Sequence, residues 1–218
     1  MFRDREEAGR LLGDLLKDYN FYKDNTVILA IPRGGVPIAY EVSKKLKIPF
    51  SLIITKKLAP LKEPEAAFGA IAPDGTKVVD ETYMKYMGVS HSELEIVREN
   101  ALEEIKNRII KYLNGKEPNI EGKDVIIVDD GIATGYTAIV ASIYSKNKGA
   151  NKVYLAVPVC PSDSILRVKK YFDNVFCYER SDSPFFAVGS FYQDFHQITD
   201  EEMFLIIEEA KKNELSYT

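Results

Sequence analysis

Residues 125–138 restrict the fold of this chain more than any other stretch of its 218 residues. The stretch begins with four apolar residues and continues through Asp129 and Asp130 into a turn of small residues. Apolar residues then recur at helical spacing over residues 138–144. Four consecutive apolar residues are typical of a strand that is buried on both faces of a parallel sheet. The turn is therefore expected at the carboxyl end of a buried strand, where open α/β sheets bind their ligands.

The rest of the chain alternates strand patterns with helix patterns. Strands are expected at residues 26–31, 50–55, 124–128, 153–159 and 174–178. Helices are expected at residues 4–19, 35–46 and 90–113. Ser90 and Glu93 have the spacing of a capping box at the start of the last of these helices. The alternation predicts an α/β fold, a doubly wound parallel sheet flanked by helices.

The length and the apolar fraction of 45% suit a single domain over residues 1–218. Two segments depart from the alternation. Residues 59–86 hold several prolines and two short strand patterns around Asp74 and Gly75, and this hairpin signal predicts a β-flap that acts as a lid. Residues 181–218 begin with a run rich in aromatic side chains and are expected to form a C-terminal hood.

Charge and residue counts exclude several classes of function. A formal net charge of −4 leaves no basic field for a nucleic-acid partner. The charged start and the lack of about 20 consecutive apolar residues argue against a signal peptide and a membrane span, so a cytoplasmic protein is expected. Cys160 and Cys177 lack metal-binding spacing and are expected to be buried free thiols. Two histidines are too few for a histidine metal cluster.

The turn after Asp130 has the composition of an anion site. Gly131, Ala133 and Gly135 let the backbone turn tightly, so several N–H groups can point at one anion at the start of the following helix. Thr134 and Thr137 add hydroxyl donors. These donors predict a bound phosphate monoester. Because neither a Walker loop nor a G-x-G-x-x-G pattern occurs, ATP hydrolysis and NAD chemistry are excluded.

Asp129 and Asp130 would repel a phosphate unless something lay between them and the phosphate. A ribose diol or a Mg²⁺ ion suits that place, because carboxylates accept hydrogen bonds from vicinal hydroxyls and bind hard cations. Their charge also favours an oxocarbenium-like sugar in a transition state. The expected ligand is a ribose 5-phosphate unit. The alternatives are a solvated pair of acids at a strand end and a phosphate-accepting switch.

At residues 125–138 the chain resembles the type I phosphoribosyltransferase family, whose phosphoribosyl pyrophosphate loop has four apolar residues, two acidic residues and a Gly/Ala/Thr-rich turn. The opening residues 2–5, the turn 31–37, residues 56–58 and the tail 191–197 resemble the stand-alone predicted phosphoribosyltransferases of bacteria and archaea. The resemblance implies that Asp129 and Asp130 hold the ribose hydroxyls. It also implies a 5-phosphate site formed by Gly131, Ala133, Thr134, Gly135, Tyr136 and Thr137.

One departure from the family pattern concerns the acceptor. Ala133 stands where 6-oxopurine salvage enzymes carry an acidic residue that is proposed to act on the base. The departure argues against hypoxanthine or guanine as the acceptor.

Two other strand ends supply cations. After the first strand, Gly34 and Gly35 free backbone N–H groups and Arg33 offers a planar donor fork to phosphate oxygens. The resemblance implies a pyrophosphate loop here, with a cis peptide bond beside Arg33. Lys56 and Lys57 are expected to end the second strand, and one of them to contact the leaving pyrophosphate. The alternatives are an ordinary glycine turn and a lysine pair that only solvates a strand end.

The aromatic tail supplies a candidate acceptor site, in which Tyr192 or Phe195 stacks on a planar base. Packing in the core or in a dimer contact is the alternative for these aromatic residues. His196 is a candidate acid or base, with a surface position as the alternative.

These features predict an enzyme that transfers the phosphoribosyl group from phosphoribosyl pyrophosphate to a nitrogenous base or similar acceptor and releases pyrophosphate. Catalytic roles fall to Asp129, Asp130, Arg33 and Lys57. The expected cofactor is Mg²⁺, bound mainly by substrate oxygens and by Asp129 or Asp130 through water. The alternative is a regulatory protein that senses phosphoribosyl pyrophosphate or a nucleotide without turnover. Whether the chain forms a homodimer is left open.

Overall fold

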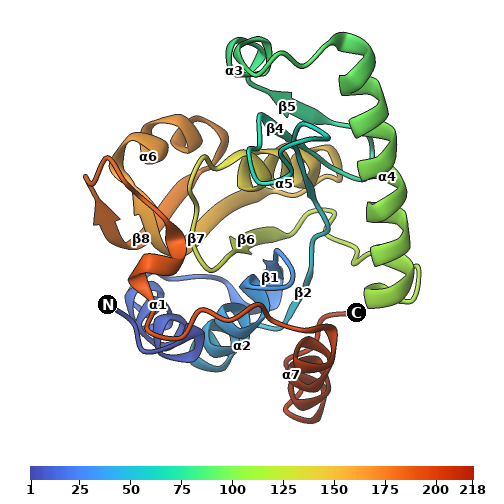
Figure 1. Ribbon diagram of the computed structural model, residues 1–218. Coiled ribbons are helices and arrows are strands. Elements are labelled where there is room, and N and C mark those ends of the chain that lie inside the picture. Colours follow the sequence, from blue (N-terminus) through green and yellow to red (C-terminus); the bar gives the residue numbers. More distant parts are fainter.

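The computed structural model describes residues 1–218, and a five-stranded parallel sheet lies at its centre (Figure 1). The strand order is β2-β1-β6-β7-β8. The strands are β1 (Thr26–Ala30), β2 (Phe50–Leu52), β6 (Asp124–Val128), β7 (Lys152–Pro161) and β8 (Asn174–Ser181). The chain runs outward from β1 to β2 in one direction and from β6 to β8 in the other, so the order reverses between β1 and β6. The carboxyl ends of these two strands are therefore the expected ligand position of the sheet.

Helices cover both faces of the sheet, which confirms the predicted α/β fold. On one face lie α1 (Arg5–Lys17), α2 (Gly35–Leu46) and α7 (Asp200–Lys212), and on the other lie α5 (Tyr136–Asn147) and α6 (Ser162–Val168) (Figure 1). Side chains of a strand alternate between the two faces. Accordingly, Ile126 and Val128 pack with α1 and α2, whereas Val125 and Ile127 pack with α5.

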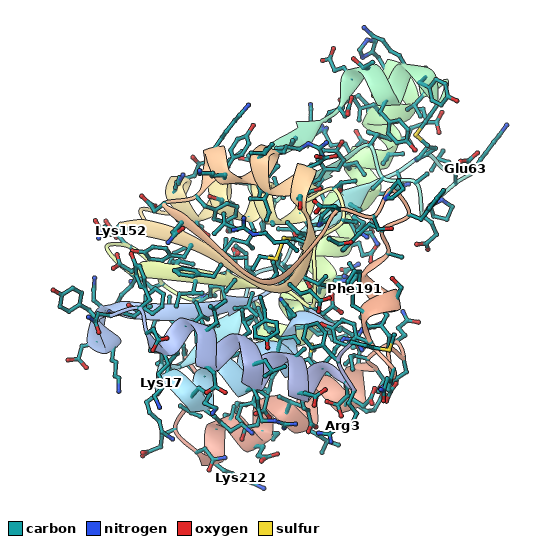
Figure 2. All side chains as sticks on the ribbon, turned by 90° about the vertical axis from the view of Figure 1, so that its left-hand side faces the viewer. Arg3, Lys17, Glu63, Lys152, Phe191 and Lys212 are labelled. Carbon is teal, nitrogen blue, oxygen red and sulfur yellow. A yellow bond between two sulfur atoms is a disulfide. The ribbon has the colours of Figure 1, made fainter.

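The segment expected as a flap forms a second sheet of three antiparallel strands, β3 (Lys56–Leu58), β4 (Gly69–Ile71) and β5 (Lys77–Val79). This sheet packs between α5 and α4 (His91–Leu113), with the short helix α3 (Glu81–Tyr86) beyond it (Figure 1). Strand β4 is fully buried. Residues 61–65 are exposed, and Figure 2 shows Glu63 at the outer edge of the molecule. The solvent-exposed part of this segment is thus the loop and not the hairpin.

Two predictions, one about the end of the second strand and one about the capping box of α4, were wrong. The second strand ends at Leu52, and Lys56 and Lys57 belong to β3, because the chain leaves the parallel sheet after Leu52 and pairs next with β4. Ser90 caps α4 by accepting from the Glu93 N–H, but the Glu93 carboxylate accepts from the Leu61 N–H at 3.1 Å instead of completing a capping box. The start of α4 is therefore linked to the exposed loop.

The cysteine prediction was also wrong, because Cys160 and Cys177 form a disulfide. Their Cα atoms lie 6.6 Å apart on the neighbouring strands β7 and β8. The spacing of two cysteines in the sequence shows neither which strands are neighbours in the sheet nor which side chains lie in the same apolar cluster.

The C-terminal segment divides into two parts. After β8, the 3-10 helix η3 (Val188–Phe191) leads back to the start of the chain, where Phe2 pairs with Tyr192 in an isolated bridge. Helix α7 packs on α2, on the face that α1 also covers, and Ser216 then bridges Phe50 of β2. Short 3-10 turns also occur at η1 (Lys23–Asn25) and η2 (Lys169–Tyr171). None of the helices combines the length and the apolar character that crossing a membrane requires.

Candidate active site

A cavity of about 640 Å³ opens at the carboxyl ends of β1 and β6. Segments that are far apart in the sequence form its walls: the loop after β1, the start of β3, the loop 59–65, one face of α4 and the turn after β6. Most of the expected site residues line it, namely Asp129, Asp130, Gly131, Ala133, Thr134, Gly135, Tyr136, Thr137, Lys56, Lys57 and Phe195. The reversal of strand order therefore coincides with the cavity.

The acidic pair at the end of β6 is held by a buried arginine. Arg5 Nε donates to Asp130 Oδ2 at 2.9 Å, and the two side chains are only 8% and 15% exposed. Arg5 also donates to the His196 carbonyl at 2.8 Å and lies 4.1 Å above the ring of Phe195. Asp129 Oδ1 accepts from the Asp130 N–H at 2.9 Å. Asp130 is thus fixed by its neighbours, whereas Asp129 keeps an oxygen for a ligand.

Burial and mutual repulsion set the charge of this pair. Burial raises the pKa of Asp129 well above its ordinary value, and the neighbouring charge of Asp130 adds to the effect. Burial also raises the pKa of Asp130, but the positive charge of Arg5 opposes that rise. The ammonium of Lys57 also opposes the rise in the pKa of both aspartates. A bound cation or a sugar with developing positive charge would favour the ionised form of both.

Two glycines after β1 allow the pyrophosphate-loop segment to approach the acidic pair. A Cβ on Gly34 would overlap the carboxylate of Asp130, and one on Gly35 would lie 2.7 Å from the carbonyl oxygen of Val128. The peptide bond between Pro32 and Arg33 is cis, as the resemblance implied. Glycine is therefore needed here for close contact with β6 and not only for backbone freedom.

The turn after Asp130 has unused backbone donors. The N–H groups of residues 133–138 donate to no protein atom, because the first hydrogen bond into the helix runs from Ile139 to the Gly135 carbonyl. The Ser164 hydroxyl donates to the carbonyl of Ala133, and Arg167 donates to that of Thr134 at 2.9 Å. A turn whose carbonyls are satisfied and whose N–H groups are free can hold an anion at a helix start.

Gly135 makes this turn possible. Its φ of +83° lies in the left-handed region, and a Cβ there would also meet Val168 of α6. Tyr136 contributes through its backbone, because its side chain is buried and its hydroxyl donates to Asp80 at 3.2 Å beside the second sheet.

The two lysines of β3 differ in their partners. Lys56 Nζ lies 2.8 Å from the Glu104 carboxylate on α4, whereas Lys57 is exposed and forms no ion pair. Lys57 is therefore the lysine that is free to contact a ligand next to Asp129.

The structure places the Arg33 side chain outside this cavity. Its guanidinium donates to Asp200 Oδ1 at 3.2 Å and borders a separate small cavity. Asp200 also accepts from Lys111 at 2.5 Å and from Tyr112 at 2.6 Å. Lys111 and Tyr112, and then Arg33, hold the pKa of Asp200 well below its ordinary value although burial acts in the opposite direction. Of the predicted pyrophosphate loop, only the backbone and the glycines face the acidic pair.

The aromatic tail contributes one residue to the cavity. Phe195 lines it, together with Val188. Tyr192 is buried behind the acidic pair, where its ring packs on Phe2 and its hydroxyl donates to the Asp130 carbonyl at 2.6 Å. His196 lies outside the cavity between Asp194 and Glu202, which raise its pKa. Tyr192 therefore supports Asp130, and Phe195 is the aromatic residue of the tail that lines the cavity.

Sequence reasoning missed Arg5 and the polar face of α4. In α1 the buried residues recur at positions 5, 8, 9, 12, 13 and 16, so Arg5 stands on the apolar stripe of an amphipathic helix. A charged residue on such a stripe signals a buried ion pair, since an unpaired buried charge is unfavourable. On α4, the polar residues Asn100, Glu104 and Arg108 line the cavity together with Val97 and Ala101.

The chain is similar to several known proteins. A family model described as "Phosphoribosyl transferase domain" matches residues 2–194. A provisionally named phosphoribosyl transferase of Mycobacterium tuberculosis (strain H37Rv) is 36% identical over 214 residues, which is 98% of this chain and 48% of that protein. The chain thus spans about half the length of this curated relative. The uracil phosphoribosyltransferase of Clostridioides difficile (strain 630) is 26% identical over 83% of this chain and 79% of that protein.

Among solved structures, the protein TT1426 of Thermus thermophilus is similar throughout. It is 32% identical, with a TM-score of 0.75 over 95% of this chain and 98% of that one. The family model covers most of the chain, and it covers the acidic pair, the small-residue turn and the glycines that approach them. The chain belongs to the phosphoribosyl transferase family.

Proposed function

We propose that the chain transfers the phosphoribosyl group of phosphoribosyl pyrophosphate to a nitrogenous base or similar acceptor and releases pyrophosphate. The observation that carries the proposal is the free N–H groups of residues 133–138 next to the paired carboxylates of Asp129 and Asp130. A phosphate in the turn would leave the sugar beside the acids. This order of donors and acceptors suits a ribose 5-phosphate unit and no simpler anion.

Electrostatics supply the expected rate enhancement. Cleavage of the bond to pyrophosphate leaves positive charge on the sugar and negative charge on the leaving group. Asp129 and Asp130 would stabilise the sugar cation, and Lys57 would stabilise the leaving group. The exposed loop 59–65 would close over the site and exclude water, which would otherwise hydrolyse the sugar cation.

Mg²⁺ fits the donor set as a cofactor that is bound mainly by the substrate. Carboxylate oxygens are suitable ligands, and Asp129 and Asp130 would contact the ion directly or through water. The chain has no cluster of three or more His, Cys, Asp or Glu side chains that could hold a metal ion. Phosphate and ribose oxygens would supply the remaining ligands, and the bound ion would neutralise charge on the pyrophosphate.

The acceptor would bind next to Phe195. Its ring lines the cavity and carries Arg5 on one face. A planar base would stack there at the side of the acidic pair. Ala133 lacks the carboxylate that would act on a 6-oxopurine, so a base other than hypoxanthine or guanine is the preferred acceptor.

The test is turnover on a panel of bases. The protein is incubated with phosphoribosyl pyrophosphate, Mg²⁺ and single bases, and pyrophosphate release is followed. Asp129→Asn combined with Asp130→Asn should lower turnover at least about a hundredfold while the protein stays folded. Binding of phosphoribosyl pyrophosphate without turnover on any base would favour a sensor. Unchanged turnover in the double variant would contradict the assigned roles.

A further inference from the structure

The disulfide between Cys160 and Cys177 lies close to the turn of residues 131–137, called here the phosphate turn, although the proposed reaction assigns it no role. Cys160 belongs to the same apolar cluster as Ile132 and Val168, and Cys177 packs against that cluster. Ile132 is part of the phosphate turn, and Val168 ends α6. The cross-link therefore belongs to the apolar packing that supports the phosphate turn.

The carboxyl end of β7 supports the phosphate turn directly. The carbonyl of Val159, the residue before Cys160, accepts from the Ile132 N–H at 3.1 Å. Helix α6 begins two residues after Cys160, and its Ser164 and Arg167 donate to two carbonyls of the phosphate turn. A shift of this end of β7 would therefore move the groups that hold the turn in place.

The segment after β8 supports the phosphate turn from a second side. β8 is the edge strand of the sheet and pairs with β7 only (Figure 1). Residues 182–187 lead from β8 to Val188 of η3. A Cβ on Gly131 would lie 2.6 Å from Val188 Cγ1 and 2.9 Å from Val159 Cγ1, so Gly131 is enclosed by both segments. The disulfide is a covalent link between the two strands that lead to these contacts.

The two sulfur atoms differ in their accessibility. Cys160 is fully buried, whereas Cys177 is half-buried on the edge strand. Thiol–disulfide exchange requires a thiolate to reach one of the sulfurs. A thiolate of a dithiol reductant would attack Cys177 Sγ, and the S–S bond would break with Cys160 leaving as a thiolate that takes up a proton. The second thiolate of the reductant then displaces the Cys177 thiolate, which is protonated, so both cysteines are reduced and the dithiol is oxidised to a cyclic disulfide.

We infer that Cys177 is a site of thiol–disulfide exchange through which the redox state of the protein controls the phosphate turn. With the disulfide intact, β7 and the segment after β8 hold the free N–H groups of residues 133–138 in one arrangement. After reduction, only the backbone ladder joins the edge strand to β7, and the turn is held less firmly. The identity of the anion in the turn rests on the proposed function.

Calorimetry with ribose 5-phosphate tests the inference on the untreated protein and on protein reduced with dithiothreitol. Reduction should weaken binding about tenfold. Because coupling is reciprocal, saturating ribose 5-phosphate should lower the reduction potential of the disulfide by the same factor, about 30 mV for two electrons. Equal affinity of the two forms would overturn the inference and leave the proposed function in place.

Cys177→Ala is the control for other effects of the reductant, because this variant cannot form the disulfide. It should bind ribose 5-phosphate as weakly as the reduced wild type, with or without dithiothreitol. Affinity equal to that of the untreated wild type would overturn the inference. A response of the variant to the reductant would do the same, since it would place the redox effect elsewhere.

Hydrogen exchange measured by mass spectrometry separates the inference from the proposed function, because it needs no ligand. The amides of Ile132 and Ile139 are hydrogen-bonded on either side of the free donors and should exchange faster after reduction. The amides of β1 should keep their protection, which shows that the reduced protein is folded. If ribose 5-phosphate binds neither form but these two amides respond, the proposed function fails and the redox control stands. Unchanged exchange at both amides would overturn the inference.

Discussion

Arg5 reaches Asp130 across 125 residues of sequence, from the first turn of α1 to the end of β6. Its other contacts, the His196 carbonyl and the ring of Phe195, belong to the C-terminal tail. One buried guanidinium therefore joins the start of the chain, the acidic pair and the C-terminal tail. Because Arg5 touches Asp130 rather than the expected substrate, it is a positioning residue.

Arg5→Gln should change the pH dependence of the reaction as well as its rate. Arg5 opposes the burial that raises the pKa of Asp130, so its loss should raise that pKa further. In the proposed reaction the ionised aspartate is the active form, so the acidic limb of the kcat/KM profile should move to higher pH. We expect kcat/KM at pH 7 to fall about a hundredfold. Arg10→Gln, at an exposed position of the same helix, should leave the profile in place.

Gly34→Ala tests the close contact between the loop after β1 and the acidic pair. The added methyl group would overlap the Asp130 carboxylate. Overpacking of this kind costs about 1–3 kcal/mol, and displacement of Asp130 should abolish most of the turnover. In a double-mutant cycle, Asp130→Ala should relieve the loss of unfolding free energy caused by Gly34→Ala. Additive losses would mean that the two residues do not contact each other.

At the scale of elements, the segment between β3 and α4 combines a fixed part and an exposed part. The strands β4 and β5 pack between α4 and α5, whereas residues 61–65 are exposed and are held to α4 only by the bond from the Leu61 N–H to Glu93. Closure over the cavity should therefore be confined to the loop. Phosphoribosyl pyrophosphate with Mg²⁺ should slow tryptic cleavage after Lys62, as followed by mass spectrometry. Unchanged cleavage at saturating ligand would contradict a closing loop.

The disulfide links β7 and β8 at the edge of the sheet. Thiol titration of the unfolded protein without reductant should find no free cysteine, because both cysteines are paired. The cross-link closes a sequence separation of 17 residues, and a loop of that length contributes about 3 kcal/mol in the chain-entropy model. Reduction should lower the free energy of unfolding by about this amount. Two titratable thiols in the untreated protein would rule out the pairing.

At the scale of the whole molecule, Asp200 joins three parts of the chain: Arg33 after β1, Lys111 and Tyr112 at the end of α4, and its own helix α7. Only 18% of its side chain is exposed. The network holds the loop after β1, the start of α7 and the α4 wall of the cavity in one arrangement. It also keeps Arg33 out of the cavity.

Asp200→Asn should lower the free energy of unfolding at pH 7 by about 1–2 kcal/mol, since hydrogen bonds to a charged group are lost. The folded pKa of Asp200 is depressed below the unfolded value of 3.8. Its contribution is therefore fully present above that value and is lost as the pH falls through the depressed pKa. Denaturant curves of wild type and variant should therefore differ less at pH 2 than at pH 7, because part of the contribution of Asp200 is lost below the unfolded pKa. Asp182→Asn, an exposed carboxylate without an ion pair, should show no pH-dependent difference.

Local patterns in the sequence were enough to predict the sheet, most helix boundaries, and the turn of residues 131–137 with its acidic pair. These features depend on neighbouring residues: apolar runs form buried strands, and glycine permits the left-handed turn at Gly135. The family resemblance, and not a local pattern, implied the cis peptide bond in the loop after β1.

Tertiary structure alone decided which charged groups meet. Arg5 pairs with Asp130, Arg33 with Asp200, and Lys56 with Glu104, across separations that no periodicity encodes. The disulfide likewise depends on the adjacency of β7 and β8. A local pattern specifies which face of an element is buried, but the partner of a long charged side chain depends on the packing of distant elements.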